Sequence, residues 1–102
     1  MSLSKEYSQD GKVCCVTFRL THDMAGAGNI VHLVGEFNDW RIHKTQMKRL
    51  KNGDFSVTLE LEAGRDYQFR YLVDDANWIN DWKADNYVCS QYGSCHNSVV
   101  SL

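Results

Sequence analysis

Three stretches of the chain alternate apolar and polar side chains with a period of two, which is the spacing of a β-strand that buries one face. They are residues 12–20, 55–62 and 67–73. The inward positions are Cys14, Val16, Phe18 and Leu20 in the first stretch, Phe55, Val57, Leu59 and Leu61 in the second, and Tyr67, Phe69, Tyr71 and Val73 in the third. Arg70 falls on the opposite face of the third strand, so the pattern predicts a charged side chain that faces solvent in mid-sheet.

Residues 31–40 begin as a strand and end in a turn. Val31 and Leu33 occupy the inward face of a half-buried strand, and Gly35 on the same face leaves room for a close neighbour or a bend. An Asn-Asp pair then favours a turn, and Trp40 follows directly. An indole on a turn is either a lid on the core or a contact surface.

Turn signals separate the strands. Asn52-Gly53 lies between residues 47–50 and 55–62 and predicts a hairpin. Further elements are predicted as turns at residues 63–66 and 74–77, a loop at 21–29 and a last strand at 97–102. Six or seven short strands without a helical period predict an all-β protein, an immunoglobulin-like β-sandwich of antiparallel strands.

Length and charge bound the domain organisation and the partners. The 102 residues suffice for a single domain, expected over residues 12–102 after a flexible N-terminal segment of residues 1–11. A net charge of −2 without a basic block argues against nucleic acid and membrane surfaces as partners. The polar N-terminus lacks the apolar core of a signal peptide, so a cytoplasmic protein is expected. The sequence contains no proline to block the pairing of exposed strand edges, so outward charges such as Arg19 and Glu60 have to serve instead. Association of several copies of the chain into a homo-oligomer through these edges is therefore a further expectation.

Four cysteines raise the question of disulfides and metals. Cys14 and Cys15 are adjacent in a strand and therefore point to opposite faces. Cys89 and Cys95 flank a loop short enough for a disulfide, and with His96 they offer part of a zinc site. The expected compartment argues against the disulfide and the ligand spacing argues against zinc, so no metal and no cofactor is expected.

Several motifs taken together resemble a known family. The motifs, in chain order, are residues 31–40 ending in Gly-Glu-Phe-Asn-Asp-Trp, Met-Lys-Arg-Leu at 47–50, Gly-Asp-Phe at 53–55, residues 61–74, Trp78, Asn80-Asp81 and Asn-Ser-Val-Val at 97–100. This order is similar to that of the N-terminal early-set domain of isoamylases and glycogen branching enzymes. The chain thus resembles carbohydrate-binding module family 48, which includes the glycogen-binding domain of the AMP-activated protein kinase beta subunit. The resemblance covers residues 12–102.

The resemblance implies an early-set β-sandwich that binds an α-1,4-linked glucan on its surface. The residues that match the family's site are Trp40, Arg70, Trp78, Tyr92, His96 and Asn97. The loop from Cys89 to His96 is one residue longer than expected of close relatives. Domains of this family are attached to glycoside hydrolase family 13 enzymes, so a glycogen- or starch-metabolising enzyme is the implied protein partner, and this chain is expected to be a stand-alone accessory module.

The chemistry of these residue types suits a sugar. A glucose ring has an apolar face of C–H groups and a polar rim, so Trp40 and Trp78 offer flat area and Arg70 offers several donors. Each also has a structural alternative: the tryptophans as lids on the core, and Arg70 as a solvated charge. Tyr92 either stacks on sugar or covers its loop.

The remaining candidates are interpreted as structural. His96 alone is usually a structural histidine, and Asn97 alternatively caps the loop. Trp82 is interpreted as packing. The acidic residues between 74 and 85 are assigned to turns, because their spacing departs from that of an EF-hand.

Catalysis is not expected. Glycoside hydrolysis requires two carboxylates that flank a bond inside a cleft, and a small sandwich offers no obvious cleft. Nucleophile elbows, phosphate loops and paired-histidine metal motifs are absent from the sequence. The sequence therefore predicts a non-catalytic module for glycogen, starch or maltooligosaccharides. The alternative is an early-set protein-interaction or scaffold domain that has lost carbohydrate binding.

Overall fold

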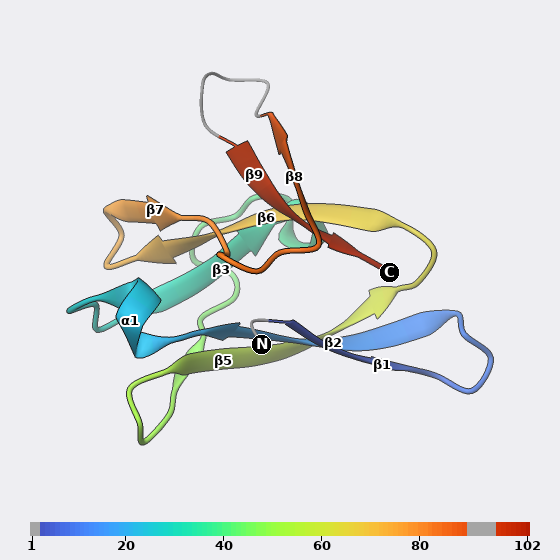
Figure 1. The fold of residues 1–102 in the computed structure, drawn as a ribbon, viewed down its shortest axis with the longest axis horizontal. Coiled ribbons are helices and arrows are strands. Elements are labelled where there is room, and N and C mark those ends of the chain that lie inside the picture. The colour runs from blue at the N-terminus through green and yellow to red at the C-terminus, as the bar shows by residue number, and fades with distance from the viewer. Residues whose placement is uncertain (1–2, 90–95) are drawn as a thin grey trace.

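The protein folds as two antiparallel sheets packed face to face (Figure 1). The computed structural model describes residues 3–89 and the backbone from residue 96, with side chains from residue 97. The first sheet has the order β1-β2-β5-β4, with bounds Leu3–Tyr7, Val13–Leu20, Phe55–Glu62 and Lys48–Arg49. The second has the order β3-β6-β9-β8, with bounds Val31–Gly35, Asp66–Val73, His96–Ser101 and Asn86–Cys89.

The second sheet has a fifth strand, β7 (Asn77–Ile79), which pairs with β6. If β7 and β8 are set aside as insertions before the last strand, the two sheets follow the ABED and CFG order of the immunoglobulin fold. Tyr67 at the start of β6 donates its hydroxyl hydrogen to the carbonyl oxygen of Glu62 at 2.9 Å, as in the tyrosine corner of that fold. The predicted immunoglobulin-like sandwich is confirmed.

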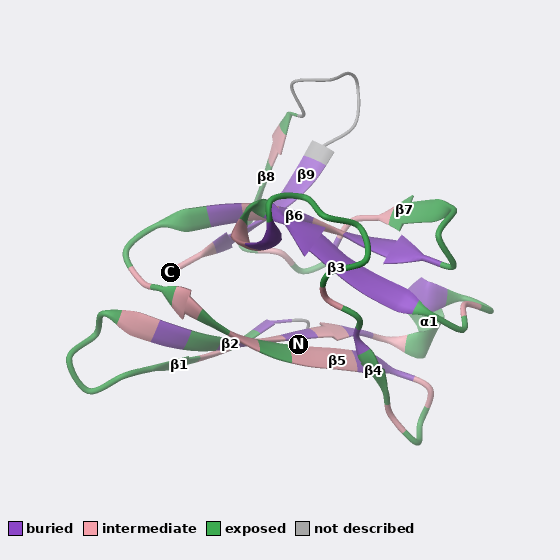
Figure 2. Cartoon of the chain, turned by 180° about the vertical axis from the view of Figure 1, so that it is seen from behind, coloured by how far each residue is buried: buried purple, intermediate pink, exposed green. Residues whose placement is uncertain are grey.

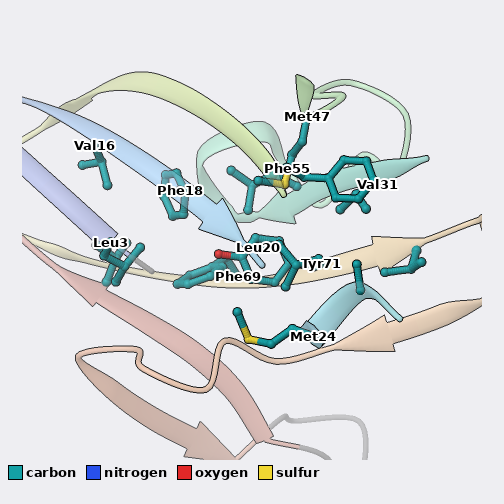
Figure 3. Packing of buried hydrophobic residues seen from close by; sticks show 14 of the residues in the cluster. Leu3, Val16, Phe18, Leu20, Met24, Val31, Met47, Phe55, Phe69 and Tyr71 are labelled. Atoms are coloured by element: carbon teal, nitrogen blue, oxygen red, sulfur yellow. The ribbon is translucent and has the colours of Figure 1, made fainter. Parts of the chain in front are cut away.

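The core lies between the sheets and uses the inward positions that the period of two predicts (Figure 3). Phe18 on β2 packs against Phe69 on β6 with ring centroids 5.1 Å apart, which joins the two layers. The inward side chains of β2 and β6 are buried, whereas those of β5 after Phe55 are only partly buried. Cys14 is buried and Cys15 is exposed, which confirms their opposite faces.

Strand β3 is buried on both faces, so the expectation of a half-buried strand is wrong (Figure 2). The outward side chains His32 and Val34 are 7% and 0% exposed. One edge of β3 pairs with β6, and the other is bridged by the segment before β4: Leu33 N donates to Thr45 O, and Met47 N to Val31 O, both at 2.8 Å. The alternation of side chains along β3 does not predict which segment pairs with its second edge.

The N-terminal segment differs from the expectation of flexibility over residues 1–11. Residues Leu3–Tyr7 form β1, which pairs with β2, and Leu3 is 6% exposed because it joins the core. Lys5 also forms an ion pair with Asp85 at 2.6 Å. A short strand with one buried leucine carries too few periodic positions to be recognised from sequence.

Two short helical turns occur, one in the expected loop at 21–29 and one where the strand that begins at Val31 was expected to end in a turn. Helix α1 (His22–Ala25) begins after Thr21, whose hydroxyl accepts from Met24 N, and η1 (Glu36–Asn38) follows β3. Neither helix is long and apolar enough to cross a membrane, a statement that covers the described residues.

Asp54 ties α1 to the β4–β5 turn. Its carboxylate accepts hydrogen bonds from Arg19 Nε and Nη2 at 3.0 and 2.8 Å, and from the backbone N–H of His22 at 2.9 Å. The imidazole Nδ1 of His22 lies 3.0 Å from the same carboxylate. Gly53 before it has a φ of 92°, as the predicted Asn-Gly turn requires.

This contact couples stability to pH. The hydrogen bond with Asp54 raises the pKa of His22. The contribution of protonated His22 to the stability of the fold is therefore complete below about pH 6.5, the usual pKa of histidine, and is lost as the pH rises through the higher pKa of the folded state. The hydrogen bonds from His22 and Arg19 hold the pKa of Asp54 far below its usual range. Its contribution is present above about pH 3.9 and is lost as the pH falls through that lowered pKa.

Replacement of Phe18 by alanine tests the core. We expect Phe18→Ala to lower the free energy of unfolding by about 3–5 kcal/mol, because it deletes a fully buried ring. Glu60→Ala, on the outward face of β5, is the control and should change it by less than about 0.5 kcal/mol. Urea denaturation measures both. Equal losses in the two variants would contradict the assignment of the core.

Replacement of His22 tests the pH coupling. Between about pH 6 and about pH 9 the melting temperature of the wild type should fall as the His22 contact is lost. His22→Asn should flatten this slope, because an amide keeps a hydrogen-bond donor and does not titrate. Thermal unfolding followed by circular dichroism at several pH values measures it, and parallel slopes in both proteins would refute the coupling.

Candidate functional site

The outward face of the five-stranded sheet brings three of the predicted site residues together. On β6, Arg70 points away from the core because it alternates with Phe69 and Tyr71. In the register of the sheet, Trp78 on β7 lies opposite Leu72, two positions from Arg70 on the same face. Val99 of β9 lies opposite Gln68, which places Asn97 on this face as well. We call this surface the outward face.

Strand β6 changes its neighbour at Arg70. Its residues 66–69 pair with β9 and residues 71–73 pair with β7, so Arg70 lies between the two pairings. The β8–β9 hairpin and β7 diverge from this point (Figure 1). The guanidinium therefore extends from a fork in the sheet rather than from a continuous row of strands.

Arg70 is partly buried, whereas the sequence predicted a solvent-facing charge. Its Nε is buried without a hydrogen-bond partner among the described residues. An unpaired donor of this kind costs about 1–3 kcal/mol. The side chain also forms no ion pair with any residue in the described part of the chain. Its terminal Nη nitrogens also form no hydrogen bond with the described residues, and they, rather than the buried Nε, are the donors left for a ligand.

Trp78 is 47% exposed, so it is not a lid buried on the core. Its partner Leu72 is 2% exposed and lies beneath this face. The strand that carries Trp78 follows a tight turn in which Asp74 and Asp75 have φ angles of 52° and 58°. Acidic and amide side chains tolerate this left-handed conformation, which explains the predicted turn at 74–77.

Gly35 and Asn38 set the position of the segment that carries Trp40. A Cβ at Gly35 would lie 2.6 Å from Gln68 O and 2.8 Å from Phe69 Cβ, so the predicted close neighbour is β6 itself. Asn38 accepts from Gly35 N at 3.1 Å and donates to Leu33 O at 2.9 Å. These bonds fold the chain back against the end of β3.

Trp40 itself is held in a strained conformation. It has a φ of 58°, as does Asp39 before it, and a left-handed backbone is unusual for a bulky residue. Its N–H donates to Gly35 O at 2.9 Å, and its side chain is 38% exposed. The backbone of Trp40 is thus bonded to Gly35. The residue before Gly35 on β3, Val34, lies opposite Arg70 in the register of the sheet.

Asn97 is 8% exposed and donates from Nδ2 to Gln68 Oε1 at 2.9 Å. This bond makes Gln68 a further polar group of the outward face. The sequence argument did not select Gln68, although it shares the alternation that singled out Arg70. Tyr92, Cys95 and the side chain of His96 lie outside the described residues.

The interpretation of Trp82 as packing is wrong, because its side chain is 67% exposed. The adjacent Asp81 takes the buried position instead and is 0% exposed. It accepts from the hydroxyl of Tyr71 at 2.9 Å, and its N–H donates to Ser98 Oγ at 2.8 Å. Burial, with the Asp81 carboxylate beside it, raises the pKa of Tyr71 well above its usual value. Anchoring Asp81 inward turns the next residue outward.

Comparison with known proteins agrees with the motifs. The family described as the glycogen recognition site of AMP-activated protein kinase matches residues 9–100. The chain is similar to the 5′-AMP-activated protein kinase subunit beta-1 of Sus scrofa, with 35% identity over 74 residues. That alignment covers 72% of this chain and 56% of the relative, so the chain spans about half the length of the curated relative that it matches.

Removal of the Arg70 guanidinium tests whether this side chain serves the fold. We expect Arg70→Met to leave the free energy of unfolding unchanged or to raise it by up to about 1 kcal/mol, because it removes a buried donor without a partner and keeps the apolar stem. Urea denaturation measures the change. A loss of more than about 1 kcal/mol would mean that Arg70 stabilises the sheet.

Proposed function

The chain belongs to the family of glycogen recognition sites of AMP-activated protein kinase, and from this premise we propose that it is a non-catalytic module that binds α-1,4-linked glucan on its outward face. The family supplies the class of ligand. The outward face supplies the chemistry by which this chain would bind it.

The guanidinium of Arg70, which has no hydrogen bond or ion pair with the described residues and lies on the same face as the exposed Trp78, is the observation that carries the proposal. A protein that only needed a stable sheet would gain from an apolar residue at this position. A glucan hydroxyl accepts hydrogen bonds from a guanidinium in a fixed planar fork. The C–H face of the same sugar stacks on an indole, which provides flat apolar area.

Each residue then has a role in binding. Trp78 stacks on one glucose unit, and Trp40 stacks on another from the segment that follows β3. Arg70 donates to hydroxyl oxygens between them. The hydrogen-bonded side-chain amides of Asn97 and Gln68 form the boundary of the site on the β9 side and contribute further polar atoms.

The loop before β9 completes the site in this proposal. Tyr92 and His96 would contact the sugar from its rim, as the family's pattern implies. The strained backbone of Trp40 supports its role as a stacking residue, because strain is retained at sites where it positions a functional group.

The wider setting is also part of the proposal. The ligand is glycogen, starch or a maltooligosaccharide in the cytoplasm. The module delivers an attached or associated glycogen- or starch-metabolising enzyme to that polymer, as family domains attached to glycoside hydrolase family 13 enzymes would. A weak single site gains avidity on a repeating polymer when several copies are joined, either by oligomerisation or in a complex.

Calorimetric titration with maltoheptaose tests the proposal. We expect a dissociation constant of about 0.01–1 mM, because stacking on an open surface is offset by the cost of ordering the sugar. Trp40→Ala, Trp78→Ala and Arg70→Met should each weaken binding about tenfold or more, equivalent to ~1.4 kcal/mol. Trp82→Ala is the matched control and should bind as the wild type does.

Two results would contradict this assignment. A wild-type protein without saturable binding at millimolar sugar would favour the alternative, an early-set interaction domain that has lost the glucan. An equal loss in Trp82→Ala would move the site away from the outward face.

A further inference from the structure

A contact between His43 and Asp75 joins the two segments that carry the tryptophans. Nε2 of His43 lies 2.9 Å from Oδ1 of Asp75. His43 belongs to the segment after Trp40, and Asp75 belongs to the turn before Trp78. Their side chains are 60% and 61% exposed. Exposed contacts of this kind add little to stability, so the fold should tolerate the loss of this one.

The ring of His32 lies beneath this contact. His32 is on the outward face of β3, opposite Leu72, which in turn is opposite Trp78. Its ring centroid is 5.1 Å from that of His43, in an edge-on arrangement. Its Nδ1 is buried, has no hydrogen-bond partner among the described residues, and lies 4.0 Å from Asp75 Oδ1. A buried nitrogen without a partner favours a carboxylate nearby.

The backbone couples His43 to Trp40. Arg41 N donates to Asn38 O at 3.2 Å and Lys44 N donates to Arg41 O at 3.4 Å, so His43 lies in a turn over residues 41–44 that directly follows the turn over residues 38–41 containing Trp40. The far end of this segment is fixed where Leu33 N donates to Thr45 O. The two turns share Arg41, which is the route by which the position of His43 would act on Trp40.

The turn between β6 and β7 couples Asp75 to Trp78. Ala76 N donates to Val73 O at 3.1 Å and closes this turn. The pairing of β6 with β7 begins directly after it, with Asn77 opposite Val73 and Trp78 opposite Leu72. The neighbouring Asp74 accepts from Asn29 N and Ile30 N, each at 2.9 Å. These two bonds lower the pKa of Asp74. The turn is thus anchored to the loop before β3 through Asp74 and to the segment after β3 through Asp75.

We propose that His43 and Asp75 form a latch that sets the spacing between Trp40 and Trp78, so that a glucan long enough to span both indoles binds a prearranged pair. The two residues are positioning residues and do not contact the sugar. This inference rests on the proposed function. Prearrangement of the site reduces the ordering cost of binding, and the benefit falls on ligands that use both tryptophans at once.

The length of the sugar distinguishes positioning from a general structural effect. His43→Ala should weaken the binding of maltoheptaose about three- to tenfold and change that of maltose, which has only two glucose units, by less than about twofold. His43→Gln places an amide donor near the position of Nε2 and should restore the wild-type affinity for maltoheptaose. NMR titrations measure both sugars, and the melting temperature should shift by less than about 4 °C in either variant.

Two further variants sharpen the test. Asp75→Gly removes the carboxylate and tolerates the positive φ of 58°, and its loss should be less than additive with that of His43→Ala, because both changes break the His43–Asp75 contact. The matched control is His22→Asn, which alters a similar histidine–aspartate contact at α1 and should leave both sugars unaffected.

Three outcomes would overturn the latch alone: unchanged maltoheptaose affinity in His43→Ala, equal losses for both sugars, or no recovery in His43→Gln. Failure of the wild-type protein to bind either sugar would overturn the proposed function and the latch with it. The two failures are therefore distinguishable in one set of titrations.

Discussion

The alternation of side chains along β6 is the constraint on which the rest of the structure depends. Tyr67, Phe69 and Tyr71 face the core, and Gln68 and Arg70 face outward from the same strand. A slip of one residue in its pairing would exchange the two sets and place a guanidinium in the core. The contact of Gly35 with β6 and the hydroxyl bond of Tyr67 to the preceding turn hold the register. Core and candidate site are thus fixed together.

The sequence predicted what depends on local chemistry. The period of two located the inward faces of β2, β5 and β6, and the Asn-Gly and Asp-Asp pairs located turns whose backbone is left-handed. The same period placed Arg70 outward, although its partial burial required knowledge of the neighbouring strands. Family motifs added the tryptophans, and neither Trp40 nor Trp78 is buried in the structure.

What the sequence could not predict depends on contacts between distant segments. Trp82 was assigned to packing, but the partners of Asp81 on β6 and β9 decide which of the two neighbours is buried. The contact of His43 with Asp75 joins residues 32 positions apart, and no periodic signal marks such a pair. The pairing of the second edge of β3 likewise depends on a distant segment, residues 45–47, that returns to it.

The absence of a Cβ at Gly35 has a consequence for how this protein can evolve. Every amino-acid replacement there adds at least one atom at a place already filled by the backbone of β6, so the position has no neutral substitutions. Trp40, five positions later, is under the opposite constraint: its left-handed backbone would be relaxed by glycine or asparagine. Mutation can therefore remove the indole while the sandwich persists, and descendants of such a domain would keep their architecture after losing the proposed glucan site.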